Sequence, residues 1–179
     1  MENLEKIEDK IKMMSEYDIV PKKKSPIAAA GFTVIGVALA ILGSTEVIKG
    51  DILEMTFMSI GTIVALYGLF RLLMVCQKDA VDYVYAPTGK KLRAHKIYIS
   101  ADSRIKVDKC IENNDYSKMK NLGKENSSNN MLHIYGSEDG EIAVFQVMEY
   151  VPHFFEPASA VVLVRGSEAK YIHEFINQK

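Results

Sequence analysis

Histidine is the residue type in this chain best suited to metal binding or acid–base catalysis, but its spacing defines no site. No histidine stands in a zinc-binding pattern such as His-Glu-x-x-His, and there is no Cys-x-x-Cys motif. The four histidines are His95, His133, His153 and His173. We interpret them as packed or surface residues.

Two motifs of catalytic proteins are present only in part. Ser-x-x-Lys occurs at residues 103–106, 117–120 and 167–170, without the Ser-Asp-Asn and Lys-Thr-Gly partners that accompany it in penicillin-binding enzymes. The stretch 86–90, Ala-Pro-Thr-Gly-Lys, lacks the earlier glycine and the following hydroxyl residue of a phosphate-binding loop. The sequence therefore predicts that the protein is not an enzyme and has no catalytic residues, cofactor or metal.

Two groups of side chains are candidates for binding. The basic group is Lys90, Lys91, Arg93 and Lys96. Near an anionic lipid surface each such side chain gains about 1 kcal/mol, so we predict contact with lipid headgroups, with a solvated strand face as the alternative. The aromatic group is Tyr150, Phe154 and Phe155, in a predicted loop beside Pro152. These rings are predicted either to contact a partner or to fold over the core.

Two long apolar segments precede these groups. Residues 27–48 contain one ionisable residue, Glu46, and residues 52–70 contain one acidic residue, Glu54, in a segment that extends to about residue 73. Each is long enough to cross a hydrocarbon core of about 30 Å. Only residues 49–51 separate them, so we predict a transmembrane hairpin in a lipid bilayer. A cleaved signal peptide and a buried soluble hairpin are the alternatives.

The charges that flank these segments predict their orientation. Lys22, Lys23 and Lys24 precede the first segment, and Arg71 and Lys78 lie at the end of the second, whereas the turn is mainly acidic. By the positive-inside rule, a multi-pass protein of the cell membrane with both termini in the cytoplasm is expected.

Small residues repeat along both segments at Gly36, Ala40 and Gly43, and at Gly61, Ala65 and Gly68. Such stripes favour close helix packing, either within the hairpin or in a homo-oligomer.

The residues before the first apolar segment have the pattern of a short amphipathic helix. Leu4, Ile7, Ile11 and Met14 repeat at heptad spacing, which predicts a helix over about 3–16. We predict that it docks on the chain's own soluble domain or on that of a copy; a solvated arm is the alternative.

Residues 77–179 are predicted to form a cytoplasmic α+β domain with a mostly antiparallel sheet that is backed by helices on one face. The domain plan is thus an arm at 1–25, a transmembrane hairpin at 26–76 and this domain. Strands are expected near 81–86, 92–100, 131–135, 141–150 and 160–165, and helices near 100–111, 116–122 and 167–178. The run 160–165 is apolar on both faces, which predicts a central strand.

The composition excludes two further features. With a net charge of −1, no nucleic acid partner is expected. The two cysteines are expected to be reduced thiols.

The sequence best fits a non-enzymatic, membrane-tethered binding or regulatory domain with a cytoplasmic protein partner. An oligomeric accessory protein for transport or channels is one alternative, and a membrane-associated enzyme with an unrecognised site is the other.

Overall fold

The computed structural model describes residues 4–45, 50–77 and 81–178, which form two compact units. The first, here called the sheet domain, combines the residues up to 21 with residues 83–179; the second, here called the hairpin, comprises residues 22–82. Helices and an antiparallel curled sheet are both present, which confirms the predicted α+β class.

The N-terminal arm is part of the sheet domain. It forms α1 (Ile7–Lys10), a 3-10 helix η1 (Ile11–Tyr17) and β1 (Ile19–Lys23). Ile7, Ile11 and Met14 are buried, as expected for a docked arm, whereas Leu4 is exposed. The expected continuous helix over 3–16 is therefore wrong in its extent, because the chain winds as 3-10 helix from Ile11 and leaves helical geometry at Met14.

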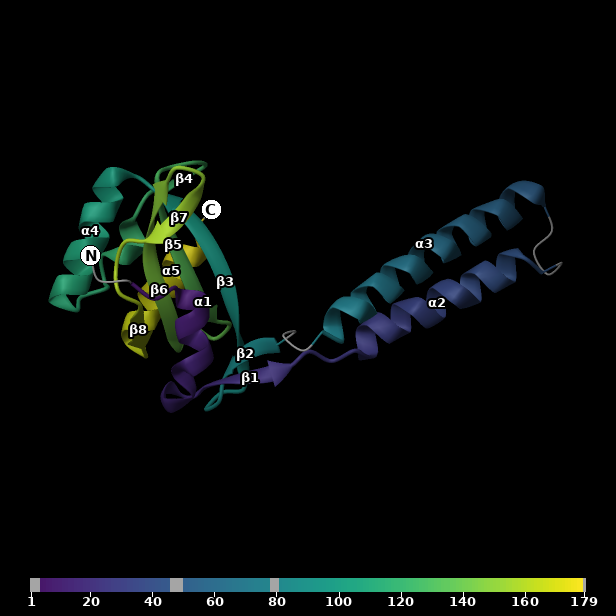
Figure 1. Cartoon of the computed structure of the whole chain (residues 1–179), viewed down its shortest axis with the longest axis horizontal. Coiled ribbons are helices and arrows are strands. Elements are labelled where there is room, and N and C mark those ends of the chain that lie inside the picture. Colours follow the sequence, from purple (N-terminus) through teal and green to yellow (C-terminus); the bar gives the residue numbers. More distant parts are fainter. Residues whose placement is uncertain (1–3, 46–49, 78–80, 179) are drawn as a thin grey trace. The chain divides into compact units, whose positions relative to one another are not determined.

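The remaining strands are β2 (Val81–Tyr85), β3 (Lys90–Ile99), β4 (Lys124–Glu125), β5 (Asn130–Ser137), β6 (Ile142–Val151), β7 (Phe154–Pro157) and β8 (Val162–Arg165). The sheet order is β1-β2-β3-β5-β6-β7, with β4 on β3 and β8 on β6 (Figure 1). Every pair from β2 onward that the described residues define is antiparallel.

The central strand is β6, not the run 160–165. β6 pairs with β5 along one edge, and its other edge pairs with β8 over residues 142–145 and then with β7 over residues 148–151. In the described chain β8 pairs with β6 alone, so the prediction of a central strand there is wrong. β8 is apolar on both faces because each face of the sheet is covered by a core. A strand at the edge of such a sheet is therefore apolar on both sides as well.

The sheet separates two apolar cores, with alternate residues of β6 facing each. Ala143, Phe145 and Val147 face α4 (Ala101–Asn113), η2 (Met119–Asn121) and α5 (Ser167–Asn177). Ile142 and Val144 face the arm. The prediction that helices back only one face was therefore incomplete, because the arm supplies helical cover for the other.

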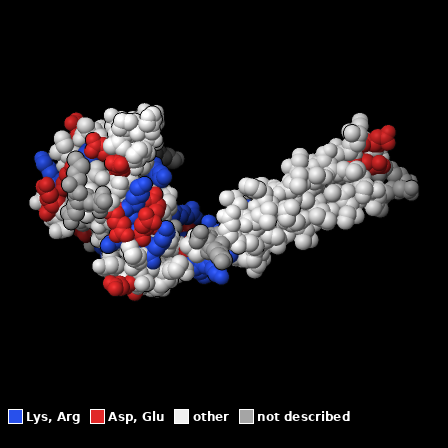
Figure 2. All heavy atoms as spheres, in the orientation of Figure 1, with Lys and Arg blue, Asp and Glu red and all other residues white. Residues whose placement is uncertain are grey.

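The hairpin consists of α2 (Ile27–Gly43) and α3 (Asp51–Val75), whose large apolar side chains are mostly exposed. Among the described residues, α3 is the one helix long and apolar enough to cross a membrane, judged by length and composition. α2 has 17 residues, so the predicted pair of membrane spans is not shown. Residues 46–49 of the predicted first span, with Glu46, lie outside the described residues. Figure 2 shows uncharged surface along the hairpin, with acidic side chains at its loop end.

Candidate binding surfaces

The stripes of small residues lie where α2 and α3 contact each other. A Cβ atom placed on Gly36 would lie 2.8 Å from the carbonyl oxygen of Gly61, and one on Gly61 would lie 2.8 Å from that of Gly36. Backbone atoms of Ala65 and Ala40 would lie closer still to the Cβ on Gly36 and on Gly61, respectively. The two backbones thus approach too closely for any larger side chain at either glycine.

The same packing continues toward both ends of the hairpin. A Cβ on Gly43 would meet the Met58 nitrogen at 2.6 Å, and one on Gly68 would meet the Thr33 hydroxyl at 2.6 Å. Thr33 donates its hydroxyl proton to the carbonyl of Ala29, so this polar group is satisfied within its own helix. Since both stripes are used between α2 and α3, the structure assigns them to packing within one chain.

The basic residues of β3 do not form one patch. Side chains alternate along a strand, so Lys90 and Lys96 lie on the arm side of the sheet, and Lys91 and Arg93 lie on the helix side. Arg93 also forms an ion pair with Glu138, at 2.7 Å between Nη2 and Oε1. The sheet therefore separates side chains that the sequence places together.

A polar groove of about 350 Å³ lies on the helix side, beside Arg93. His95 from β3 and His173 from α5 line it together with Glu138. The pKa of His95 is lowered, first by burial and then by the positive charge of Arg93. His95 is therefore neutral near pH 7, and the Arg93 charge is already compensated by Glu138.

Two of the predicted aromatic residues contribute to a different surface. Tyr150 and Phe155 face each other across β6 and β7, with ring centroids 5.3 Å apart. The chain reverses between them within a tight hairpin in which His153 has a φ of 81°, so these rings lie on strands rather than in the predicted loop. Phe154 lies on the opposite face by strand alternation and is exposed.

Tyr98 completes this aromatic surface, although sequence reasoning missed it. Its ring centroid lies 5.9 Å from that of Phe155. The two residues belong to β3 and β7, which are separated by two strands, and neighbouring strands lie about 4.8 Å apart. The rings meet because the sheet is curled and both side chains lie on its arm side. Alternation along residues 92–99 was the available signal, since it places Tyr98 on the same face as Lys96.

Two hollows share these rings as a common wall, and together they are here called the aromatic groove. One part, of about 270 Å³, is lined by Lys6, Glu8, Lys96, Tyr98, Met131, His133, Met148 and Phe155. An adjoining part, of about 550 Å³, is lined by Tyr98, Asn126, Ser127, Ser128, Asn129, Tyr150 and Phe155. Tyr98 and Phe155 belong to both parts, so the groove runs from the arm to the 126–129 loop.

His133 is buried where the arm meets the groove. Its Nδ1 lies 3.4 Å from Oε1 of Glu8 on α1, and its ring packs 5.2 Å from that of Tyr135. Burial lowers the pKa of His133; the Glu8 carboxylate opposes this shift and Lys96 adds to it. The second oxygen of Glu8 is buried and has no hydrogen-bond partner among the described residues. This His–Glu pair joins the arm to the sheet.

Gln146, fully buried on β6, also connects the arm to the sheet. Its side-chain oxygen accepts from the Ile7 amide at 2.9 Å, and its nitrogen donates to the carbonyls of Glu5 and Ser159 at 2.9 and 3.0 Å. All polar atoms of this side chain are thus used to hold the arm and the segment between β7 and β8.

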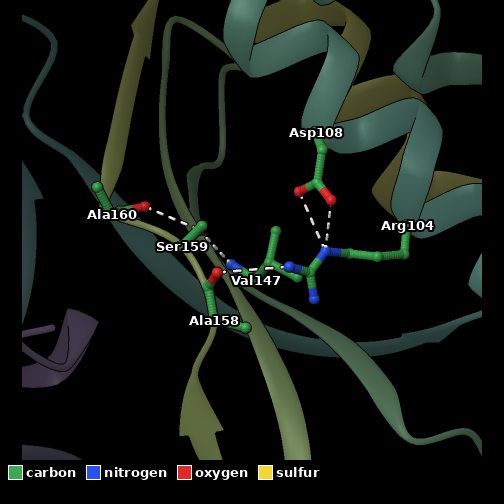
Figure 3. Close-up of polar contacts among 6 residues, drawn as sticks. All are labelled: Arg104, Asp108, Val147, Ala158, Ser159 and Ala160. Atoms are coloured by element: carbon green, nitrogen blue, oxygen red, sulfur yellow. Dashed lines mark hydrogen bonds and ion pairs between the residues drawn. The ribbon is translucent and has the colours of Figure 1, made fainter. Parts of the chain in front are cut away.

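The segment between β7 and β8 is held in turn by β6 and α4 (Figure 3). Ser159 accepts from the Val147 amide at 3.0 Å and donates to the Ala160 carbonyl, so its hydroxyl is fully engaged. Arg104, which binds Asp108 at 2.9 Å, also donates to the Ala158 carbonyl at 3.4 Å. The bond from the Val147 amide occupies the edge of β6 between its two partner strands, and all of these bonds have a structural role.

The remaining reactive side chains are dispersed. Cys110 is buried with a pKa raised by burial, and Cys76 is exposed beyond the end of α3. In the part of the chain that the structure describes, no three His, Cys, Asp or Glu side chains are placed to hold a metal ion. The sequence matches no protein-family model, and comparisons with curated proteins and with solved structures find no similar protein.

Proposed function

We propose that this protein is a non-enzymatic binding module tethered to the membrane by both helices of the hairpin. The supporting observation is the place of the hairpin within the chain: it is inserted between β1 and β2, which are neighbours in one sheet. The chain leaves the sheet domain and returns to it at the same place.

Two contacts show how closely the chain returns to its point of departure. The amide of Ala86 donates to the carbonyl of Asp18 at 2.7 Å, which ties the segments around β1 and β2 together. Within the hairpin unit, Lys24 forms an ion pair with Asp82 at 3.8 Å. If α3 crosses a bilayer, α2 must cross it in the other direction, because the chain starts and ends on the same side.

The lengths of the helices are compatible with this arrangement. α3, with 25 residues, is about 37 Å long, and α2, with 17 residues, is about 25 Å long, against a hydrocarbon core of about 30 Å. A short span is accommodated by local thinning of the bilayer. After α2, the hydroxyls of Ser44 and Thr45 donate to carbonyls of its last turn, at 2.8 and 2.9 Å, which reduces the polarity of this end.

The charges at the two ends support a cytoplasmic sheet domain in the cell membrane. Lys22, Lys23, Lys24 and Arg71 lie at the end from which the chain enters and leaves the hairpin. Asp51 and Glu54 lie in the first turn of α3, at the opposite end. The positive-inside rule then places both termini in the cytoplasm.

The character of the aromatic groove supports binding rather than catalysis. It places aromatic rings and thioethers between charged side chains at one end and amide and hydroxyl groups at the other, a mixture that is typical of recognition surfaces. The oligomeric accessory role is the weaker alternative, because the small-residue stripes that would pair copies are used within the hairpin.

Membrane extraction and cysteine labelling test the tether. We expect the protein to stay in the pellet after alkaline carbonate treatment. In intact cells, a membrane-impermeant maleimide should label a Ser44→Cys, Cys76→Ser variant, whereas Cys76 of the native chain should react only after lysis. Recovery in the supernatant without detergent, or labelling of Cys76 in intact cells, would contradict the proposal.

A further inference from the structure

We propose that the aromatic groove binds an extended peptide segment of a partner protein in which an acidic end is followed by apolar side chains. This inference rests on the proposed function, since it names the ligand of the binding module. It follows from the shape of the groove, its apolar floor and rings, and the distribution of charge along it.

The shape of the groove fits an extended chain. Its two parts, of about 270 and 550 Å³, join at Tyr98 and Phe155, and together they run from the arm to the loop at 126–129. An open surface that extends from one hollow across a ring pair to a second, shallower hollow accepts a linear ligand of several residues more readily than a small compact one.

The middle of the groove provides apolar contacts that adapt to a ligand. Met131 and Met148 are neighbours across β5 and β6 and are almost fully buried under the groove. Thioether side chains adjust to differently shaped partners, and aromatic rings add large contact areas at low entropic cost. Tyr150, which is exposed, extends this apolar surface outward. Apolar side chains of a peptide would rest here.

The arm end of the groove is positively charged. Lys6 and Lys96 line it, and neither has an ion-pair partner among the described residues. Among the described lining residues Glu8 is the one carboxylate at this end, so the two lysines leave a net positive charge. An acidic side chain at this end would therefore gain attraction from both lysines, and a basic one would be repelled.

The loop end of the groove favours a peptide over an acyl chain. Asn126, Ser127, Ser128 and Asn129 line it with amide and hydroxyl groups. These groups can exchange hydrogen bonds with a peptide backbone, whereas a hydrocarbon chain would cover them without replacing their bonds to water.

Methyl NMR of the full-length protein in phosphatidylcholine nanodiscs tests this inference. With ¹³C-methyl methionine, the Met131 and Met148 signals report on the groove. The probe is an acetylated, amidated peptide that begins with two aspartates and continues with alternating phenylalanine and serine; the control peptide begins with two lysines. We expect the acidic peptide to shift both signals at lower concentration than the lysine peptide. A Lys96→Glu variant should bind the acidic peptide about tenfold more weakly.

A Lys90→Glu variant is the matched control, because Lys90 lies on the same strand and face but does not line the groove. Its affinity should equal that of the native chain. The inference is overturned if neither peptide shifts the two signals, if both variants bind equally, or if anionic phosphatidylglycerol in the nanodisc shifts them and the peptides do not. In each case the tether can still be present by extraction and labelling, so the two proposals fail separately.

Discussion

Single buried polar residues decide how the N-terminal arm is held to the sheet. Gln146 and His133 lie side by side on β6 and β5, and both contact α1. Neither residue stands in a motif, so sequence reasoning did not select Gln146 and interpreted His133 only as a packed or surface residue. Their role depends on the arm, which is more than a hundred residues away in the chain.

Replacing Gln146 with leucine should destabilise the sheet domain. The Ile7 amide would lose its acceptor while remaining buried, and two carbonyls would lose a donor. We expect a loss of about 2–4 kcal/mol in the free energy of unfolding, measured by urea denaturation. Gln77→Leu, at an exposed position in the hairpin unit, should change it by less than about 0.5 kcal/mol. A loss below 1 kcal/mol for Gln146→Leu would show that the arm is held without this side chain.

The stability of the sheet domain should fall on mild acidification because of His133. Burial lowers its pKa in the folded state, so the unfolded chain binds the extra proton first as the pH falls through about 6.5. Between that pH and the lower folded-state pKa, stability therefore decreases with decreasing pH. The groups that face His133 are Glu8, Lys96, Gln146 and Tyr135.

Urea denaturation at pH 7.5 and pH 5.5 measures this dependence, and a His133→Gln variant serves as its control. The variant should lose less stability between the two values than the native chain. Asp115 and Asp139, whose pKa values are lowered, lose their contributions only at more acidic pH and contribute equally in both proteins. Equal losses in the native chain and the variant would show that His133 has the same pKa in the folded and the unfolded chain.

At the scale of elements, the close approach of α2 and α3 is the feature most open to test. Lipid gives no hydrophobic force between helices, so backbone proximity at glycine determines how well they pair. The position of each glycine within the interface therefore matters more than the helix propensity of the residue that replaces it.

Gly61→Ala should weaken the hairpin, since the added Cβ would lie 2.8 Å from the Gly36 carbonyl oxygen. We expect a loss of about 1–3 kcal/mol for the native protein in detergent, measured by titration with SDS and circular dichroism. Gly31→Ala is the matched control, because a Cβ at Gly31 meets no atom within 4 Å. It should be neutral or slightly stabilising, since alanine is the better helix former. Equal effects of both changes would exclude backbone contact at Gly61.

At the scale of the whole molecule, the arm is part of the fold that follows the hairpin. The apolar core between the sheet and the arm contains four almost fully buried arm residues, Ile7, Ile11, Met14 and Ile19. Burial of four such side chains contributes about 6–12 kcal/mol, which is comparable to the whole stability of an ordinary domain. The domain expected over 77–179 therefore lacks one side of its own core.

Two truncated chains test this organisation. Residues 81–179 alone should fail to fold, whereas a chain with residues 25–79 replaced by an Asn-Gly turn should fold and remain in solution, because β1 and β2 are neighbours. Circular dichroism and urea denaturation distinguish the outcomes. A peptide of residues 1–24, added to the isolated 81–179 chain, should restore cooperative unfolding. A cooperative transition for 81–179 without the peptide would show that the arm is dispensable.

Local pattern in the sequence determined the α+β class, the apolar helical segments with their small-residue stripes, the position of α4 and most strand positions. These features depend on residues a few positions apart, where periodicity and capping operate. The tertiary structure alone decided which segments meet. It placed β6 rather than residues 160–165 at the centre, divided the basic residues of β3 between two faces and brought Tyr98 to Phe155. Such contacts depend on strand pairing, register and sheet curl between distant segments, and a one-residue change of register reverses every side chain.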